Sequence, residues 1–204
     1  MNVTQYIGEQ FGKPTGIGGK ISTFVMNQMN QKQYNATQSL LKLSDDERVL
    51  DIGFGNGYFL RKLSRKSNSQ LYGIDVSDDM VQYAKHRLKK QIAQGTMAVE
   101  QGDVMHLDFP DGYFDKVCSI NTLYFWRGLG PGLREIHRVL KPEGVFITAI
   151  YSKEFLESWS YTQYGFAKYT LQEIEEAAVR HGFTVHMTTI KKGVSYCFAF
   201  SKVG

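Results

Sequence analysis

The chain has 204 residues, of which 42% are hydrophobic and 22% are charged, with a formal net charge of +4. These proportions are ordinary for a globular protein, and the length suits one domain with a sizeable core. The sequence lacks both the roughly 20 consecutive apolar residues of a membrane span and the apolar run of a secretory signal, so we expect a cytoplasmic protein.

The first part of the chain, residues 1–46, is glycine-rich and then looks helical from about Lys20 to Leu43, so we expect an N-terminal helical cap. From residue 47 onward, strand-like and helix-like segments alternate. This alternation predicts a parallel sheet with helices on both faces. The expected strands are Arg48–Ile52, Gln70–Ile74, Met97–Gln101, Phe114–Ile120, Gly144–Ile150, Phe183–Ile190 and Ser195–Ser201.

Several expected helices have residues at their ends that are typical of helix termini. Ser77 is an expected N-cap because acidic residues fill the turn that follows it. Pro131 suits a first helical position, and residues 141–144 are expected to end that helix. Thr170 and Glu173 have the spacing of a capping box at the start of the last helix.

The last two expected strands are separated by about four residues, which is too short for a parallel crossover. The seventh strand is therefore predicted to run antiparallel to the sixth. The expected fold is one α/β domain with a seven-stranded, mostly parallel sheet, an antiparallel last strand and helices on both faces. Its core is 47–150, and 169–204 forms the last helix and terminal hairpin. The aromatic segment 151–168 is expected to be a lid insertion, or else an ordinary hydrophobic flap.

A glycine-rich turn follows the first expected strand at once. It comprises Asp51, Gly53, Phe54, Gly55, Asn56 and Gly57. Glycines let a backbone approach a ligand closely, and a position between a strand and a helix is the context that ligand binding requires. Dinucleotide sites read G-x-G-x-x-G, which this turn does not.

Acidic residues end the first three strands. Asp51 would repel a diphosphate and attract a cationic amino group, unless it merely caps its strand. Asp75 can accept hydrogen bonds from both hydroxyls of a ribose, or could act as a helix N-cap. Asp103, after Gly102, is placed to accept from an adenine amino group, or could be a solvated loop residue. Apolar walls for the base would be Val76, Met80 and Val104.

These motifs together resemble the class I S-adenosylmethionine-dependent methyltransferases, in particular the bacterial small-molecule group similar to the ubiquinone/menaquinone methyltransferases. The matching segments are 49–57, 73–77, 102–104, 109–115 and 135–144. The resemblance implies a Rossmann-like fold, S-adenosylmethionine as cofactor, and methyl transfer as the activity. It also implies that Asn121 and Thr122 line the site near the sulfonium, in addition to the cofactor residues given above.

Methyl transfer from a sulfonium is an in-line displacement with a good leaving group, so alignment and exclusion of water are the main tasks. A general base is needed only if the acceptor must lose a proton, so the sequence does not identify the catalytic residues. Among the histidines, His106 is the one best placed to act as a general base. The residues expected to meet the acceptor are Tyr124, Trp126, Tyr151, Trp159 and Tyr161.

The acceptor is expected to be a small apolar or aromatic molecule. Methyltransferases that act on amino groups of DNA or of glutamine have a motif similar to Asn-Pro-Pro-Tyr after the fourth strand. This chain has neither proline there. Methylation of RNA or protein, and a non-catalytic module that binds the cofactor, stay open as alternatives. The glycine spacing disfavours an NAD-dependent oxidoreductase.

Cysteine, histidine and basic residues add three expectations. Cys118 and Cys197 lie in strand-like apolar runs, so buried free thiols are expected, with a disulfide as the alternative. The five histidines are scattered and no cysteine pair has ligand spacing, so no metal site is predicted. Basic clusters at 61–66 and 85–90 are interpreted as solvated helix faces, and a nucleic-acid partner is disfavoured. The sequence gives no prediction of oligomeric state.

Overall fold

The computed structural model describes residues 27–203 of the chain. Its centre is a seven-stranded sheet in the order β3-β2-β1-β4-β5-β7-β6. The strands are β1 (Arg48–Ile52), β2 (Gln70–Asp75), β3 (Met97–Gln101), β4 (Phe114–Ile120), β5 (Leu140–Tyr151), β6 (Phe183–Lys191) and β7 (Ser195–Lys202). The helices are α3 (Gln31–Leu41), α4 (Tyr58–Leu63), α5 (Asp78–Arg87), α6 (Lys89–Ala93), α7 (Leu129–Val139), α8 (Lys153–Glu157) and α9 (Leu171–Arg180), with short 3-10 turns η1 (Leu123–Phe125) and η2 (Ser160–Thr162).

The sheet has the predicted directions. Strands β3, β2, β1, β4 and β5 pair in parallel, whereas β7 pairs antiparallel with both β5 and β6. Strand β6 therefore runs with the first five, and β7 alone runs against them. The predicted mostly parallel α/β sheet with an antiparallel last strand is confirmed, and β7 inserts between β5 and β6.

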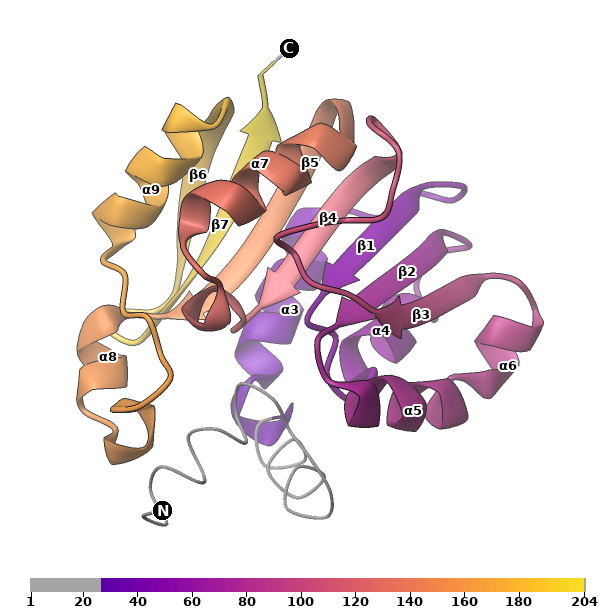
Figure 1. The fold of residues 1–204 in the computed structure, drawn as a ribbon, viewed down its shortest axis with the longest axis horizontal. Helices are drawn as coiled ribbons and strands as arrows, with labels where there is room; N and C mark the ends of the chain where they lie inside the picture. The colour runs from indigo at the N-terminus through magenta and orange to yellow at the C-terminus, as the bar shows by residue number, and fades with distance from the viewer. Residues whose placement is uncertain (1–26, 204) are drawn as a thin grey trace.

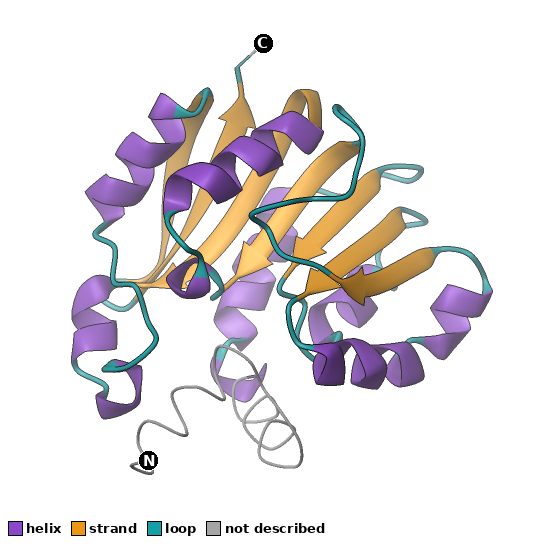
Figure 2. Cartoon of the chain, viewed as in Figure 1, coloured by secondary structure: helices purple, strands orange, loops and turns teal. Residues whose placement is uncertain are grey.

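Helices cover both faces of the sheet, as Figures 1 and 2 show. Buried residues of α7 and α9 pack on one face of the sheet, together with Leu50 and Phe146. Buried residues of α3, α4 and α5 pack on the other face, together with Val49 and Ile147. Val49 and Leu50 are neighbours in β1, and Phe146 and Ile147 are neighbours in β5. Because successive strand residues point to opposite faces, continuous apolar runs supply both cores.

The junction of α7 and β5 differs from the prediction. Residues 141–144 were expected to end the helix, and this was wrong, since α7 ends at Val139 and β5 begins at Leu140 rather than Gly144. Leu140 is fully buried and pairs with Phe114 of β4, so the strand pairing already begins at this residue.

Two helices, α7 and α3, begin at residues that differ from the prediction. Helix α7 begins at Leu129, which makes Pro131 its third residue rather than its first. That position is tolerated because N–H groups in the first turn have no partner within the helix. The predicted helix from about Lys20 to Leu43 is present as α3, Gln31–Leu41, and its expected first residues lie outside those described.

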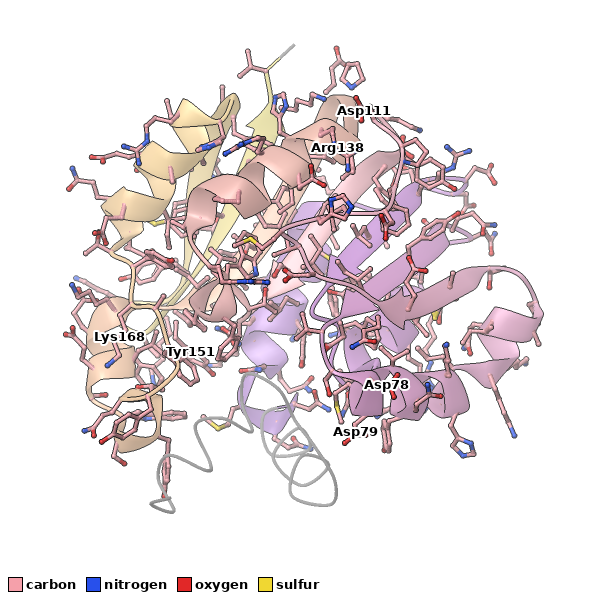
Figure 3. All side chains as sticks on the ribbon, viewed as in Figure 1. Asp78, Asp79, Asp111, Arg138, Tyr151 and Lys168 are labelled. Atoms are coloured by element: carbon pink, nitrogen blue, oxygen red, sulfur yellow. The ribbon has the colours of Figure 1, made fainter. Side chains whose placement is uncertain are left out.

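The parallel strands end at one edge of the sheet, where α8 and the start of α3 also lie (Figure 1). Tyr151, the last residue of β5, marks this edge in Figure 3. The ion pair of Arg138 with Asp111 lies at the opposite edge. Among the helices described from residue 27 to residue 203, none combines the length and apolarity needed to cross a membrane.

The capping box of α9 gives a stability prediction. The Thr170 hydroxyl accepts from the Glu173 N–H at 3.1 Å, and the Glu173 carboxylate accepts from the Thr170 N–H at 2.7 Å. Replacing Thr170 with Ala should lower the free energy of unfolding by about 1 kcal/mol, measured by denaturant titration. Glu175→Ala, an exposed change within the same helix, should stay within about 0.5 kcal/mol of the parent. Equal losses in the two variants would contradict the assigned cap.

Candidate functional site

The glycine turn after β1 has a backbone that requires glycine. Gly53, Gly55 and Gly57 have φ angles of 72°, 56° and 71°, in the left-handed region. A Cβ on Gly53 would also lie 2.4 Å from Cγ2 of Thr122, whereas one on Gly55 would meet nothing within 4 Å. The turn therefore touches the end of β4 on one side and leaves its backbone at Gly55 open to a ligand.

Asp51 is a buried carboxylate with one oxygen left over. Its side chain is 2% exposed, and the Cys118 thiol donates to its Oδ1 at 3.7 Å. Within the described part of the chain, Oδ2 has no hydrogen-bond partner. Burial raises the pKa of Asp51 to about 7; the contact with Cys118 lowers it, and nearby Asp75 adds to the increase. A partnerless buried carboxylate oxygen fits the amino group of an amino-acid ligand.

Asp75 joins the end of β2 to the glycine turn. Its Oδ2 accepts from the Gly55 N–H at 2.8 Å, and its Oδ1 accepts from the Ser77 N–H at 2.9 Å. Burial raises the pKa of this carboxyl. Ser77 is the N-cap of α5, and its side chain accepts from the Met80 N–H, as predicted. Each carboxylate oxygen of Asp75 keeps a further lone pair with which it can accept from a ribose hydroxyl.

Asp103 is more exposed than the other two acids, and both of its carboxylate oxygens have partners within the protein. Its Oδ1 accepts from the Met105 N–H at 3.0 Å, and its Oδ2 pairs with Arg127 at 2.9 Å. Of the predicted apolar walls beside it, Val76 has a side chain 42% exposed, whereas Met80 and Val104 are buried. Gly102 packs tightly on Ile74 of β2, since a Cβ there would lie 3.2 Å from that side chain.

Two predicted cofactor residues support the turn with their side chains. Phe54 is buried and lies against Gly73, where an added Cβ would be 2.7 Å from its ring. The Asn56 Oδ1 accepts from the Tyr58 N–H at 3.1 Å, at the start of α4. These two positions therefore offer a ligand their backbone rather than their side chains.

A mostly apolar pocket lies next to the end of β4. It has a volume of about 510 Å³, counting space open to solvent. Its lining is Met29, Asn30, Asn121, Tyr124, Phe125, Tyr151, Leu156, Trp159, Thr162 and Phe166. Three residues predicted to meet an acceptor, Tyr124, Tyr151 and Trp159, thus lie together in this aromatic pocket.

The other two predicted acceptor residues are not in that lining. Trp126 is 7% exposed and packs in the core, where its ring meets Gly132 and stacks on Phe146 at 6.4 Å. Tyr161 is 41% exposed. An aromatic residue in a strand-end loop can serve core or pocket equally well, and the sequence pattern does not distinguish the two.

Side chains of α3 and of the turn before it contact residues of the pocket, and none of them is among the site residues that the sequence predicts. The side-chain amides of Gln33 and Asn121 donate to each other at 3.1 and 2.9 Å, and both are buried. The Tyr124 hydroxyl also donates to the Asn121 Oδ1 at 3.2 Å, and the Tyr151 hydroxyl donates to Asn30 at 3.0 Å. Asn121 has a φ of 59°, so its amide is held in a left-handed backbone at the tip of β4.

The described lining of the pocket offers no carboxylate, histidine or lysine as a base. His106 is exposed and lies 3.4 Å from Asp108. The tyrosine hydroxyls are poor bases at neutral pH, because burial raises the pKa of Tyr151 to about 12 and that of Tyr124 further. The described lining of the pocket therefore contains no charged side chain.

The contact between Gly53 and Thr122 gives a testable prediction. Gly53→Ala should destabilise the protein more than Gly95→Ala, because Gly95 has a φ of 71° but open space around it. We expect about 1 kcal/mol for Gly95→Ala from the backbone alone, and a clearly larger loss for Gly53→Ala, by denaturant titration. Adding Thr122→Ala should recover part of the excess. Equal losses at the two glycines would show that the turn does not press on β4.

Comparison with known proteins agrees with this geometry. A family model described as a methyltransferase domain matches residues 50–148. YdaC of Bacillus subtilis (strain 168), named an uncharacterized methyltransferase, is 28% identical over 183 residues, which is 89% of this chain and 98% of the relative. Sterol 24-C-methyltransferase of Eremothecium gossypii is 31% identical over 140 residues, 69% of this chain but only 36% of that enzyme.

A solved structure shows the same fold. Phosphoethanolamine N-methyltransferase 2 of Haemonchus contortus, in complex with S-adenosyl-L-methionine, superposes with a TM-score of 0.72 at 21% identity, covering 84% of this chain and 52% of that one. The matched domain, the full-length relative and the sheet order agree with the motifs at the strand ends. The methyltransferase family model and the relative named as a methyltransferase support a class I S-adenosylmethionine-dependent methyltransferase.

Proposed function

We propose that this enzyme transfers a methyl group from S-adenosylmethionine to a small apolar or aromatic acceptor held in the aromatic pocket. One observation carries the proposal: Asn121 and Thr122 are adjacent at the end of β4 and face the two halves of the site. Thr122 contacts the glycine turn at Gly53, and Asn121 lines the pocket. A donor on the turn and an acceptor in the pocket would therefore meet at this point.

The donor would be held by groups at the strand ends. Asp51 would accept from its amino group, the open backbone at Gly55 would lie along its amino-acid part, and Asp75 would accept from its ribose hydroxyls. The adenine would lie between Val76, which is 42% exposed, and the loop at Asp103. In this arrangement Arg127 would have to share Asp103 with the adenine amino group.

When bound, S-adenosylmethionine supplies a methyl group on a sulfonium. The bond from the methyl carbon to sulfur would break with both electrons going to sulfur, as a lone pair or π pair of the acceptor forms the new bond, and a proton that the methylated acceptor loses would pass to solvent. The chain's contribution is alignment and exclusion of water. The rings of Tyr124, Trp159 and Phe166 line the pocket without offering a competing nucleophile stronger than a neutral hydroxyl. An acceptor that is already nucleophilic suits a pocket whose described lining holds no base.

The proposed acceptor class follows from the lining and finds support in a relative. Aromatic and aliphatic walls favour flat or hydrocarbon-like molecules over nucleic acid, whose phosphates require cationic partners. The Eremothecium gossypii relative is named for methylating a sterol, itself a largely apolar molecule. Segment 151–168, which contributes Tyr151, Trp159 and Phe166, would close over such an acceptor.

A mutation in the aromatic pocket should affect methylation of the acceptor without affecting binding of the cofactor product. Trp159→Ala should leave the affinity for S-adenosylhomocysteine unchanged, by isothermal titration calorimetry. It should lower methylation at least tenfold for whichever acceptor is turned over in a mass-spectrometric screen of hydroxylated, aromatic and isoprenoid compounds. Tyr161→Ala, outside the pocket lining, is the matched control and should change neither quantity. Full activity in Trp159→Ala, or turnover of RNA or protein alone, would contradict the proposed acceptor site.

The pKa of Asp51 predicts how binding and stability depend on pH. Without ligand, a carboxyl whose pKa is raised from 3.8 to about 7 stabilises the fold while protonated, and that contribution is lost as the pH rises through this interval. Asp51→Asn should therefore be the more heat-stable protein at about pH 8 in the absence of ligand. It should nevertheless bind S-adenosylhomocysteine at least tenfold more weakly than the parent.

The parent's affinity for S-adenosylhomocysteine should rise between about pH 6 and about pH 7.5 as Asp51 ionises, and that of Asp51→Asn should not. Calorimetric titrations at several pH values, with thermal melts of both proteins, measure these differences. A parent affinity that is flat across this interval would contradict an ionising Asp51 as the amino-group ligand.

A further inference from the structure

A buried thiol touches the carboxylate at the centre of the cofactor site. Asp51 of β1 and Cys118 of β4 are direct partners in the parallel register of the two strands. Their side chains are 2% and 0% exposed. The Cys118 sulfur lies 3.7 Å from the Asp51 Oδ1, within the range of a hydrogen bond from sulfur. Of the two alternatives that the sequence left open, a free buried thiol and a disulfide, the structure has Cys118 as a free buried thiol, and this thiol has a polar partner.

The thiol keeps its proton, so it can act as the donor in this contact. Burial raises the pKa of Cys118 well above its usual value, and the neighbouring Asp51 carboxylate raises it further. A neutral S–H beside an ionised carboxylate can only donate. The interaction therefore occupies Oδ1, and Oδ2 stays without a partner among the described residues.

The other groups near Asp51 do not replace this donor. Asp75 of β2 is a second acid and disfavours the ionised form of Asp51. Tyr34 of α3 is close enough to interact electrostatically, but its hydroxyl donates to Asn27 at 2.8 Å. Cys197 of β7 interacts electrostatically with Cys118 and has Thr37 as its own partner at 3.9 Å. Within residues 27–203, Cys118 is thus the side chain that donates to Asp51.

We propose that Cys118 is a positioning residue for cofactor binding: its thiol fixes Asp51 through Oδ1 and leaves Oδ2 to accept from the amino group of S-adenosylmethionine. The inference rests on the proposed role of Asp51. Without the thiol, the carboxylate loses its donor at Oδ1 and rotates about its side-chain bonds or takes up a proton. Either change weakens its pairing with the ligand's amino group.

The role of Cys118 can be tested by comparing the affinities for two ligands, of which only one carries the amino-acid part. S-adenosylhomocysteine carries the amino acid, and 5′-methylthioadenosine has the same adenosyl thioether without an amino or carboxyl group. Calorimetry on the full-length chain should give Cys118→Ala a roughly tenfold loss of affinity for S-adenosylhomocysteine and no change for 5′-methylthioadenosine. Cys118→Ser, which keeps a donor, should recover part of the loss. Cys197→Ala, the matched control in the same buried layer, should bind both ligands like the parent.

A pH series adds a readout that simple loosening of the core would not move. In Cys118→Ala the pH at which S-adenosylhomocysteine binding is half-maximal should lie above that of the parent, because the carboxylate has lost its donor. Equal weakening for both ligands, or an unchanged affinity for S-adenosylhomocysteine, would overturn the role of Cys118. If Cys118→Ala does not fold, Cys118→Ser must show an intermediate, ligand-selective loss, and parent-like or equal effects on both ligands would overturn the role.

Failure of the proposed function has a different signature. If Asp51→Asn leaves the ratio of the two affinities unchanged, Asp51 does not hold the amino group, and the role of Cys118 falls with it. If Asp51→Asn lowers that ratio and Cys118→Ala does not, Asp51 keeps its role and only the positioning by Cys118 is wrong.

Discussion

The carboxylate of Asp51 is buried at the end of a central strand, where the sheet offers it one thiol donor and a second acid nearby. Burying an acid in this way costs free energy that the free protein does not recover, as the raised pKa of Asp51 indicates. In the proposed function, a cationic amino group of the ligand would offset that cost. The sharp glycine turn that follows Asp51 would give the ligand room, so the proposed layout of the site depends on this residue.

The remaining contacts connect the strand ends into one surface. Asp75 ties β2 to the turn at Gly55, and Thr122 packs the tip of β4 against Gly53. On the other side of that tip, the amide pair of Gln33 and Asn121 ties β4 to α3. In the proposed function, the donor half of the site would consist largely of backbone and acids, and the acceptor half of aromatic side chains. Such a division would let related proteins keep one methyl donor while acting on different acceptors.

Much of this could be predicted because it follows from local patterns. Apolar runs marked strands such as β1 and β4, the spacing of Thr170 and Glu173 gave a capping box, and the short last connection fixed the direction of β7. Contacts between residues far apart in the chain left no local signal. The pairing of Gln33 with Asn121, and of Cys118 with Asp51, depends on sheet order and register. For the same reason the pattern could not separate Trp126, which packs in the core, from Tyr124, which reaches the pocket.

The most direct test of this account is a crystal structure of the protein with S-adenosylhomocysteine. It should place the ligand's amino group within hydrogen-bonding distance, about 3 Å, of the Asp51 Oδ2, with the Cys118 thiol still on Oδ1. The ribose should lie on Asp75, and the ligand's sulfur should face the aromatic pocket past Asn121 and Thr122. A ligand bound with its amino group away from Asp51, or with its sulfur turned from the pocket, would contradict the account.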